Sequence, residues 1–367
     1  MISVNSRRKF RVAMIHYGTG RSEGGAENTV KAVSRELVKR GHEVYIITNF
    51  GKVRMPDGVN VIRVPYVRIP LFRKLDYLSM MVTFSLFAFC VALVKRCNVI
   101  HVQFYIDGFF PIVLAKLFGI RTVYTANGML LEELKVASLA DAIGVYCRYL
   151  KEHYDSLGIR CYEAFVGIDE NLMKPDRKAG EKMRKRLGIG KDDFVVTVVA
   201  RPAGLKAPET LYDIVRKTDE NIHFILVGIG AWVKFQEMRK HRKNLHTFGI
   251  VAHDELASFY RAADISMHME TVPGICITIL ESIACGTPVI SATPAGGAHE
   301  IVSSEVGYKM PLDAEKIAAL IRSLSSKKRV LRAMCKDGSV FLGKKGYLWS
   351  ITAQRYEKIY QDITGNR

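Results

Sequence analysis

A single carboxylate on a short helix is the strongest candidate for chemistry in this chain. The segment 263–302 reads as a buried strand, a Pro-Gly loop, a helix carrying Glu281, a second strand and the glycine pair Gly296 and Gly297. In open α/β sheets, ligands bind in the crevice at the carboxyl ends of the strands. A helix N-terminus there presents free N–H groups and partial positive charge. The segment therefore predicts a site for a phosphorylated ligand.

Two cations follow another predicted strand of the same half. Arg201 comes directly after the apolar run 193–200, and Lys206 follows a short turn before the next helix. An Arg side chain can hold a diphosphate through two parallel hydrogen bonds, and a Lys side chain adds a mobile point charge. Two solvated surface cations would give the same letters. Their position at a strand end and a helix start favours an anion-binding cradle.

A glycine-rich turn lies near the start of the chain. Gly24 and Gly25 follow the first apolar strand at 10–16 and open a helix, and glycines let a ligand approach the backbone closely. The turn is not the dinucleotide-binding fingerprint, because the third glycine expected after Gly18 and Gly20 is missing. The sequence contains no P-loop, EF-hand or zinc-site motif. A ligand-binding turn and a plain chain reversal both remain open at this point.

Short apolar strands alternate with helical segments in both halves of the chain. This alternation predicts parallel sheets with right-handed crossovers. A polar bridge at 167–182 separates the two series. We therefore predict an α/β protein of two Rossmann-like, doubly wound domains that face a central cleft. The predicted strands include 10–16, 98–104, 121–125, 142–146, 193–200, 222–228, 245–249, 263–268 and 288–291.

The charge balance is strongly basic. The 54 Lys and Arg residues exceed the 36 Asp and Glu residues, so the formal net charge is +18, with much of the excess in the first 75 residues. Such a surface indicates an anionic partner, which could be nucleic acid, anionic lipid or a phosphorylated substrate. Solubility alone is the other explanation. The seven cysteines form no CxxC pair, which is typical of reduced thiols, and no secretory signal opens the chain, so we expect a cytoplasmic protein.

The segment 77–94 holds 18 consecutive residues without a charge, near the lower limit for a membrane-spanning helix. Its place between two predicted strands favours a buried or membrane-touching helix over a span. Basic residues precede it, and each one close to an anionic leaflet contributes about 1 kcal/mol. The predicted membrane contacts are Arg63, Arg68, Arg73 and Lys74.

These motifs, in this order, resemble a retaining glycosyltransferase of the GT-B fold, in the large family 4 that uses nucleotide-diphosphate sugars. The resemblance runs from about Phe10 to Tyr360 and includes a last helix that returns to the first domain. It implies a first domain of residues 1–172 plus 346–367 and a second of residues 173–345. The motifs are GGAE at 24–27, RGHEVYIIT at 40–48, NVIHV at 98–102, GID at 167–169, LESIACGTPVI at 280–290 and GGAHEIV at 296–302.

The resemblance also implies roles for single residues. Arg201 and Lys206 would hold the donor diphosphate and offset its charge as it leaves, which is usually a large catalytic contribution. Glu281 would accept hydrogen bonds from the ribose hydroxyls. No metal or other cofactor is expected, since the cationic side chains replace a metal. Backbone contacts to the donor are implied for Gly24, Gly25, Gly274, Ile275, Cys276, Gly296 and Gly297.

Two positions depart from the family pattern. The family pairs Glu281 with an earlier glutamate, with seven residues between them, but that position is Pro273 here. Glu270 lies three residues before it and either substitutes or is a solvated carboxylate. The second departure is Asn127, where the family has a histidine near the reacting carbon. Both changes leave a front-face mechanism in which the departing phosphate assists deprotonation of the acceptor.

The sequence therefore predicts a cytoplasmic enzyme, peripheral on the membrane. It would transfer a sugar with retention from a UDP- or GDP-sugar to a lipid-linked or cell-surface glycan acceptor. Pro273 and Asn127 motivate an alternative, a degenerate GT-B protein that binds nucleotide sugar or a partner without turnover. Nucleic-acid binding is motivated only by charge, and no reader motif supports it.

Overall fold

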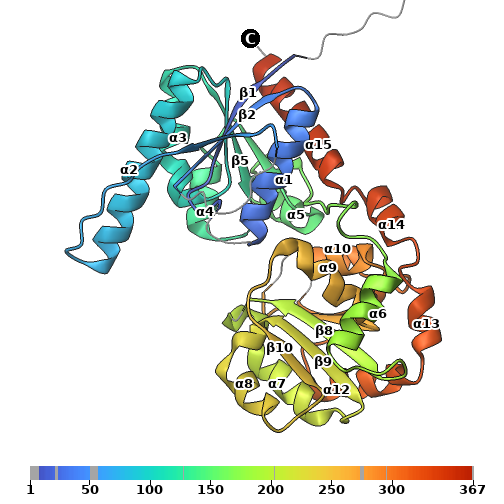
Figure 1. The fold of residues 1–367 in the computed structure, drawn as a ribbon. Coiled ribbons are helices and arrows are strands. Elements are labelled where there is room, and N and C mark those ends of the chain that lie inside the picture. The colour runs from blue at the N-terminus through green and yellow to red at the C-terminus, as the bar shows by residue number, and fades with distance from the viewer. Residues whose placement is uncertain are drawn as a thin grey trace, which may run out of the picture. The chain divides into compact units, whose positions relative to one another are not determined.

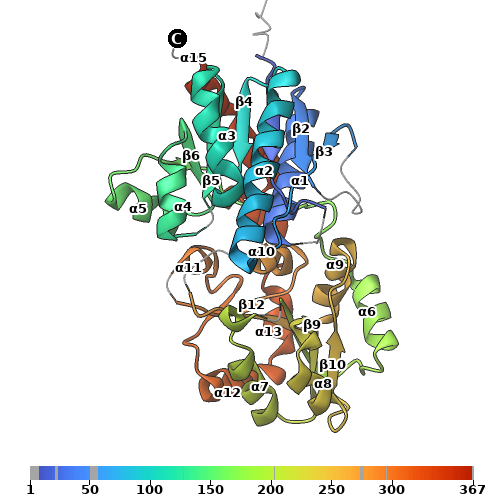
Figure 2. The same ribbon diagram turned by 90° about the vertical axis from the view of Figure 1, so that its left-hand side faces the viewer.

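The computed structural model of the chain describes residues 8–20, 24–49, 57–126, 128–201, 203–272, 277–294 and 296–365. It divides into two compact units, Met1–Gly167 with Trp349–Arg367 and Ile168–Leu348 (Figures 1 and 2). The second unit begins at Ile168 rather than at 173 and ends at Leu348 rather than at 345. The reason is local, because Ile168 and Leu348 form a parallel β-bridge and the Ile168 N–H donates to the Tyr347 carbonyl at 3.0 Å.

A parallel sheet forms the centre of the first unit, with seven strands in the part of the chain that the structure describes. The neighbours β1 and β4 mark the point where the strand order reverses. Both are apolar and buried along nearly their whole length, as expected for a parallel sheet covered on both faces. In spatial order the strands are β3 (Asn60–Arg63), β2 (Glu43–Thr48), β1 (Arg11–Ile15), β4 (Val99–Val102), β5 (Arg121–Ala126), β6 (Ala142–Val145) and β7 (Tyr162–Glu163).

Helices cover both faces of this sheet. Figure 1 shows α2 and α3 on one side and α1 and α15 on the other, and Figure 2 shows α2 and α3 lying over the strands. On α1, Val30, Val33 and Leu37 are buried, which confirms the helical spacing seen in the sequence. The helices are α1 (Gly25–Lys39), α2 (Arg73–Val94), α3 (Tyr105–Leu117), α4 (Leu131–Ala137), α5 (Arg148–Ser156) and α15 (Trp349–Gly365).

A buried polar network fixes the returning helix α15 to the first sheet. The His101 ring on β4 contacts the Tyr360 hydroxyl through Nδ1 at 2.7 Å and the Thr125 hydroxyl through Nε2 at 2.6 Å. The Tyr356 hydroxyl bonds to Thr125 at 2.5 Å. Burial lowers the pKa of His101 to about 3, so the ring is neutral. The last helix therefore belongs to the first unit, although it follows the second in the sequence.

The second unit repeats this design around a parallel sheet with six strands among the described residues. Together, the two units confirm the predicted fold class of two Rossmann-like α/β domains. The first part of the second sheet is the long strand pair β8 and β9, which pairs over seven residues from Phe194↔Ile222 to Ala200↔Gly228. In spatial order the strands are β10 (Leu245–Phe248), β9 (Ile222–Gly228), β8 (Phe194–Ala200), β11 (Ile265–Met269), β12 (Val289–Ala292) and β13 (Gly307–Lys309).

Apolar clusters form on both faces of the second sheet, because alternate strand residues point to opposite sides. Helix α7 packs against α12 on one face, and α6 packs against α9 on the other. The helical segments are α6 (Arg177–Arg186), the 3-10 turns η1 (Gly204–Lys206) and η2 (Ile229–Ala231), α7 (Pro208–Lys217), α8 (Val233–Arg239), α9 (His253–Ala262), α10 (Ile277–Ala284), α11 (Gly297–Ile301), α12 (Ala314–Ser325), α13 (Lys328–Ala333) and α14 (Gly338–Lys345).

Candidate active site

Two of the predicted segments meet at the carboxyl edge of the second sheet. Arg201 follows β8 and Glu270 follows β11, and these two strands are neighbours in the sheet. The loops after them are also joined, since the Thr271 N–H donates to the Leu205 carbonyl at 3.0 Å. Residues that are about 65 positions apart in the sequence are thereby placed side by side, at the edge where ligands bind in this class of sheet.

Lys206 and Glu270 form an ion pair through Nζ and Oε1. Their side chains are only 17% and 12% exposed, so Glu270 is not the solvated carboxylate that the sequence left open. The other carboxylate oxygen lies 3.6 Å from His268 Nε2. Burial, and then the charge of Lys206, hold the pKa of His268 well below its usual value, so this ring is neutral. The carboxylate after β11 thus orients the ammonium group of Lys206, which lies in the turn after β8.

Arg201 is exposed at the end of β8, and among the described residues it has no ion-pair partner. A cation in this position keeps its charge available for a ligand. The backbone at the end of β9 approaches the end of β8, just before Arg201. This approach depends on Gly228, which has φ +75°. A Cβ at this glycine would lie 2.5 Å from the Ala200 carbonyl oxygen, so another residue would displace the strand end that carries Arg201.

Glu281 lies on α10, as predicted, and α9 orients its carboxylate. Oε1 lies 2.8 Å from His253 Nε2, and Oε2 accepts a hydrogen bond from the Tyr260 hydroxyl at 3.0 Å. Three residues earlier, and so on the same face of the helix, Thr278 Oγ1 lies 3.3 Å from His268 Nδ1. These contacts join α10 to the end of β11. The buried carboxylate retains lone pairs for a ligand hydroxyl.

His253 and Tyr260 were not singled out in the sequence. Their spacing of seven residues puts them on one face of a helix, which is the only local signal they carry. Gly296 and Gly297 are buried at the start of α11, directly after β12 and its following loop. Four predicted positions lie outside the described residues, so their roles stay predictions. They are Asn127, Gly274, Ile275 and Cys276.

The predicted glycines of the first unit lie at the corresponding edge of its own sheet. Gly24 is buried at the N-terminus of α1, and a Cβ there would lie 2.2 Å from Oε2 of Glu27. A larger residue at position 24 would therefore have to displace the Glu27 carboxylate, which lies at the end of a flexible side chain. His16 follows β1 and lies 2.9 Å from the Thr19 hydroxyl. Burial lowers the pKa of His16, and the charge of Glu27 partly opposes this shift.

The first unit also contains two buried polar groups that were not predicted. Asp107 on α3 accepts a hydrogen bond from the Tyr17 N–H at 2.8 Å, and its second oxygen has no partner among the described residues. Burial raises the pKa of Asp107 to about 7. The amide nitrogen of Gln103, which follows β4, likewise has no partner among the described residues. Both residues lie beside the β1–β4 switch point, where doubly wound sheets bind ligands.

The apolar segment of the sequence forms α2, which is partly buried and partly exposed. Phe84, Ala88 and Ala92 are fully buried on one face. By length and composition, Leu75–Val94 is long and apolar enough to cross a membrane, and 39% of that window is buried. At the start of the helix, Leu71 is 71% and Phe72 is 76% exposed. Figure 1 shows these first turns of α2 projecting from the rest of the first unit.

The predicted membrane-contact cations lie close to this apolar tip or on the neighbouring edge strand. Arg63 is exposed at the end of β3. Arg68 is 60% exposed and pairs with Asp76, with Nε 2.9 Å from Oδ1, so part of its charge is matched locally. Arg73 and Lys74 begin α2, and their side chains lie outside the description. The expected membrane role of these cations stays a prediction.

Known proteins share the fold along almost the whole chain. Sucrose-phosphate synthase from Thermosynechococcus elongatus aligns with a TM-score of 0.83 at 19% identity, over 98% of this chain and 100% of that one. Anabaena HepE in complex with UDP-glucose aligns with a TM-score of 0.76 at 18% identity, over 95% and 99% of the two chains. Residues 23–166 match the family model described as Glycosyltransferase Family 4, and residues 180–339 match Glycosyl transferases group 1. The fold and these domains define a glycosyltransferase of the GT-B class.

The chain is thus a glycosyltransferase that joins a family 4 domain to a group 1 domain. Three relatives cover most of it. The phosphatidylinositol N-acetylglucosaminyltransferase GPI3 subunit of Saccharomyces cerevisiae is 24% identical over 93% of this chain and 80% of its own length. D-inositol 3-phosphate glycosyltransferase of Xylanimonas cellulosilytica is 26% identical over 79% of both chains. Alpha-monoglucosyldiacylglycerol synthase of Streptococcus pneumoniae is 24% identical over 73% and 67%.

Proposed function

We propose that this enzyme transfers a sugar, with retention at the anomeric carbon, from a UDP- or GDP-sugar to a lipid-linked or glycan acceptor. The observation that carries the proposal is the cluster at the carboxyl edge of the second sheet. Arg201 there is exposed, and Lys206 is held in place by Glu270. An oriented ammonium group beside an exposed guanidinium group suits a diphosphate leaving group, because both charges are in position before the reaction begins.

The transfer step follows from this arrangement. The bond between the anomeric carbon and the phosphate oxygen breaks while the acceptor oxygen bonds to the same face of that carbon. The acceptor proton passes to the departing phosphate, so no protein base is required. Arg201 and Lys206 offset the charge that develops on the diphosphate. This front-face route accommodates Asn127 and Pro273, neither of which can accept a proton.

The donor nucleotide would extend along α10. Glu281 would accept hydrogen bonds from the ribose hydroxyls, while His253 and Tyr260 keep its carboxylate oriented. Gly24 and Gly25 would meet the donor phosphates, and the backbone near Gly274 and Gly296 would meet the sugar. The complex of HepE with UDP-glucose supports a uridine nucleotide. No metal is required in this scheme, because the two cations take its place.

A lipid acceptor is supported by the relatives and by the exposed apolar tip of α2. One relative is named for phosphatidylinositol and another for diacylglycerol. In this chain Leu71 and Phe72 are largely exposed and lie next to basic residues. Apolar side chains beside cations are typical of peripheral attachment to an anionic leaflet. We propose that the enzyme docks on the cytoplasmic face of the membrane in this way.

Thermal unfolding with a panel of nucleotides tests the donor site. We expect UDP or GDP to raise the melting temperature, since a ligand that binds only the folded state stabilises it. The rise should disappear in Arg201→Ala and persist in Arg216→Ala, which removes an exposed cation from α7 in the same unit. An unchanged rise in Arg201→Ala would place the nucleotide elsewhere.

Turnover separates the enzyme from the degenerate alternative. With a matching nucleotide sugar and a crude membrane-lipid acceptor, we expect nucleotide release that depends on the acceptor. The Arg201→Ala variant should lack it. Binding of the nucleotide sugar with no release, across a panel of donors and lipid acceptors, would favour a binding protein that lacks turnover.

A further inference from the structure

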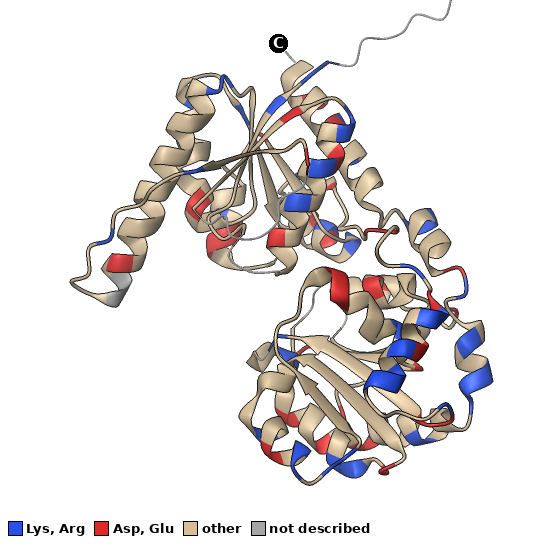
Figure 3. Ribbon diagram, in the orientation of Figure 1, with Lys and Arg blue, Asp and Glu red and all other residues tan. Residues whose placement is uncertain are grey.

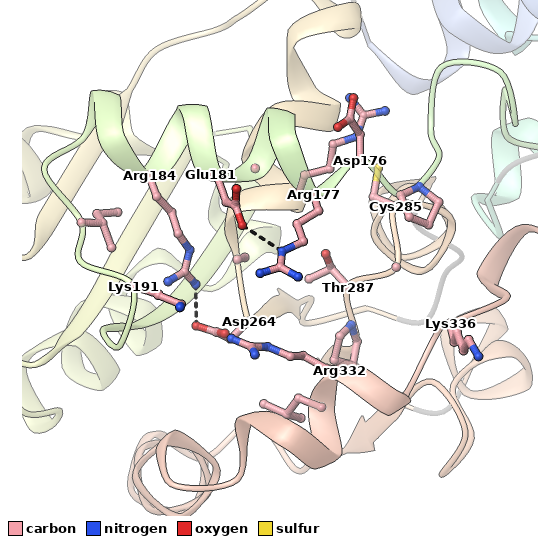
Figure 4. Close-up of a pocket in the computed structure, with 18 of the residues that line it drawn as sticks. Asp176, Arg177, Glu181, Arg184, Lys191, Asp264, Cys285, Thr287, Arg332 and Lys336 are labelled. Atoms are coloured by element: carbon pink, nitrogen blue, oxygen red, sulfur yellow. Dashed lines mark hydrogen bonds and ion pairs between the residues drawn. The ribbon is translucent and has the colours of Figure 1, made fainter.

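A basic cavity of about 770 Å³ opens at the opposite edge of the second sheet from the candidate active site (Figure 4). Its wall includes Asp264 and Pro288, which directly precede β11 and β12. In a parallel sheet these are the amino ends of the strands, whereas Arg201 and Glu270 follow the carboxyl ends. The five residues of β11 span roughly 17 Å, so the cavity is separate from the donor site. Its volume lies in the range of small-molecule sites.

The charge around this cavity is positive. Seven Lys and Arg residues line it against three carboxylates. Most of them come from α6, in which six of the ten residues are basic, and from the α13 region, and Figure 3 shows the concentration of Lys and Arg on these two helices. Such a surface raises the local concentration of anions.

The carboxylates of the cavity are already matched. Asp264 Oδ2 accepts a hydrogen bond from Arg184 at 2.7 Å and lies 3.6 Å from the Lys328 ammonium group. Glu181 pairs with Arg177 at 2.8 Å. Asp176 caps α6 by accepting a hydrogen bond from the Ala179 N–H. Each of the three carboxylates in the wall therefore already has a partner within the protein.

Four of the lining cations have no such partner. Among the described residues, no ion pair or hydrogen bond engages the side chains of Lys185, Lys191, Arg332 and Lys336. They come from α6, from the turn before β8 and from the segment around α13, so they surround the opening from several directions. Figure 4 shows Lys191 and Arg332 on the same side of the cavity as the Arg184–Asp264 pair. Cations that converge without internal partners are suited to bind an external anion.

The floor of the cavity is neutral. Thr287 and Pro288 are buried there, and burial raises the pKa of the Cys285 thiol to about 12, so the thiol is uncharged. Gly180 brings α6 against α9, because a Cβ at this position would lie 2.3 Å from the Arg261 carbonyl oxygen. The cavity therefore combines neutral residues, fixed by backbone packing, with cations that come from three segments.

We propose that this cavity is a second binding site, for the phosphate group of an anionic ligand that differs from the donor. The ligand is a phosphorylated small molecule or a phospholipid headgroup, since both present the same multivalent oxyanion to the cations. The cavity is also linked to Glu281 through α9, which supplies the lining residue Arg261 and orients the Glu281 carboxylate. Thr287 on the floor donates to the Tyr260 carbonyl at 2.7 Å, and the Tyr260 hydroxyl donates to Glu281 at 3.0 Å.

The test compares two triple variants that lose the same charge. The cavity variant removes three of the lining cations that have no partner among the described residues. It combines Lys191→Ala, Arg332→Ala and Lys336→Ala. The control variant removes three exposed cations that lie elsewhere in the same unit and do not line the cavity. It combines Arg216→Ala, Lys240→Ala and Lys316→Ala. Both sets carry Arg201→Ala and Lys206→Ala in addition, so that the proposed donor site contributes no binding.

Inorganic pyrophosphate, followed by titration calorimetry, is the soluble probe. Vesicles of phosphatidylglycerol, compared with phosphatidylcholine in a sedimentation assay, are the lipid probe. We expect one of the two probes to bind the cavity variant about tenfold more weakly than the control variant. Loss of pyrophosphate binding identifies a soluble phosphate compound, and loss of vesicle binding alone identifies a headgroup. If the cavity and control variants bind both probes equally, the cavity is not an anion site, whatever the fate of the donor site.

Discussion

The carboxyl edges of the two sheets carry different kinds of polar chemistry. In the second unit the groups are charged, with Arg201 exposed and Lys206 paired to Glu270. In the first unit they are buried, and burial disfavours their charged forms, since it lowers the pKa of His16 and raises the pKa of Asp107 to about 7. The same fold thus provides one edge with exposed charge, the charged edge, and one edge whose buried groups hold less charge, the neutral edge.

The two ends of the second sheet both carry cations, in different surroundings. At its carboxyl end Lys206 is paired with Glu270, and Arg201 is exposed with no ion-pair partner among the described residues. At its amino end the carboxylates are matched internally and cations such as Lys191 and Arg332 are left over. Positive charge alone therefore does not locate the active site. The partner of each cation decides which charge is available for a ligand.

The largest effect is expected where the charged edge is broken. Lys206→Ala removes the ammonium group that offsets the leaving diphosphate, and such groups contribute about 2.7–4 kcal/mol to catalysis. We expect a transfer rate about 10²- to 10³-fold lower, measured as acceptor-dependent nucleotide release. Lys240→Ala, which removes an exposed cation paired with Glu237, should leave the rate unchanged. A Lys206→Ala rate within twofold of the parent would refute the assigned role.

Loss of Lys206 also leaves Glu270 mostly buried and without its partner, which could destabilise the unit. The double variant Lys206→Ala with Glu270→Gln removes both charges. If it regains the melting temperature of the parent but not the rate, the rate loss belongs to catalysis and not to folding. Recovery of the rate by the double variant would count against the catalytic role.

The sequence predicted the places of the second unit's candidate residues better than the contacts between them. The positions of Arg201 and Glu281 could be predicted because each has a fixed place relative to a strand or helix that the apolar pattern reveals. The pairing of Lys206 with Glu270 was not found, because it depends on β8 and β11 being neighbours. The contact between His253 and Glu281 likewise requires the packing of α9 against α10.

The first unit was harder to predict for a related reason. Asp107 lies in an apolar run, and nothing in its neighbours marks it as buried beside a switch point. The apolar composition of α2 was evident, but composition does not tell which turns are covered. The structure shows that Phe84 is buried while Phe72 is 76% exposed. Burial depends on where the sheet ends, which local sequence does not encode.

A smaller effect is expected when the apolar tip of the first unit is changed. Leu71→Ser with Phe72→Ser should weaken binding to anionic vesicles about tenfold or more, because each large apolar side chain contributes about 1.5–3 kcal/mol when fully removed from water. Serine at position 72 also suits the N-terminus of α2, so the helix should persist. Co-sedimentation with vesicles measures the change.

The matched control for the tip lies in the second unit. Val330→Ser with Val340→Ser changes two side chains that are 51% and 57% exposed on α13 and α14. This control should bind vesicles like the parent. Equal vesicle binding by the tip and control variants would show that the α2 tip does not contact the membrane. The two units would then not differ in membrane binding.

The smallest expected effect, counted per pH unit, is a change in the free energy of unfolding with pH. Only the neutral edge should show it. The pKa of Asp107 rises from 3.8 to about 7 on folding, so the folded state holds this proton more tightly. Its contribution to stability is complete below about pH 4 and is lost as the pH rises toward and through 7, by at most about 1.4 kcal/mol per pH unit. Asp107→Asn does not titrate, and its amide oxygen can still accept the Tyr17 N–H. In urea unfolding from pH 4 to 8 we therefore expect the parent to lose stability relative to this variant. The exposed Asp155→Asn serves as control, and parallel curves for the parent and Asp107→Asn would mean that the pKa of this carboxyl is the same in the folded and unfolded states.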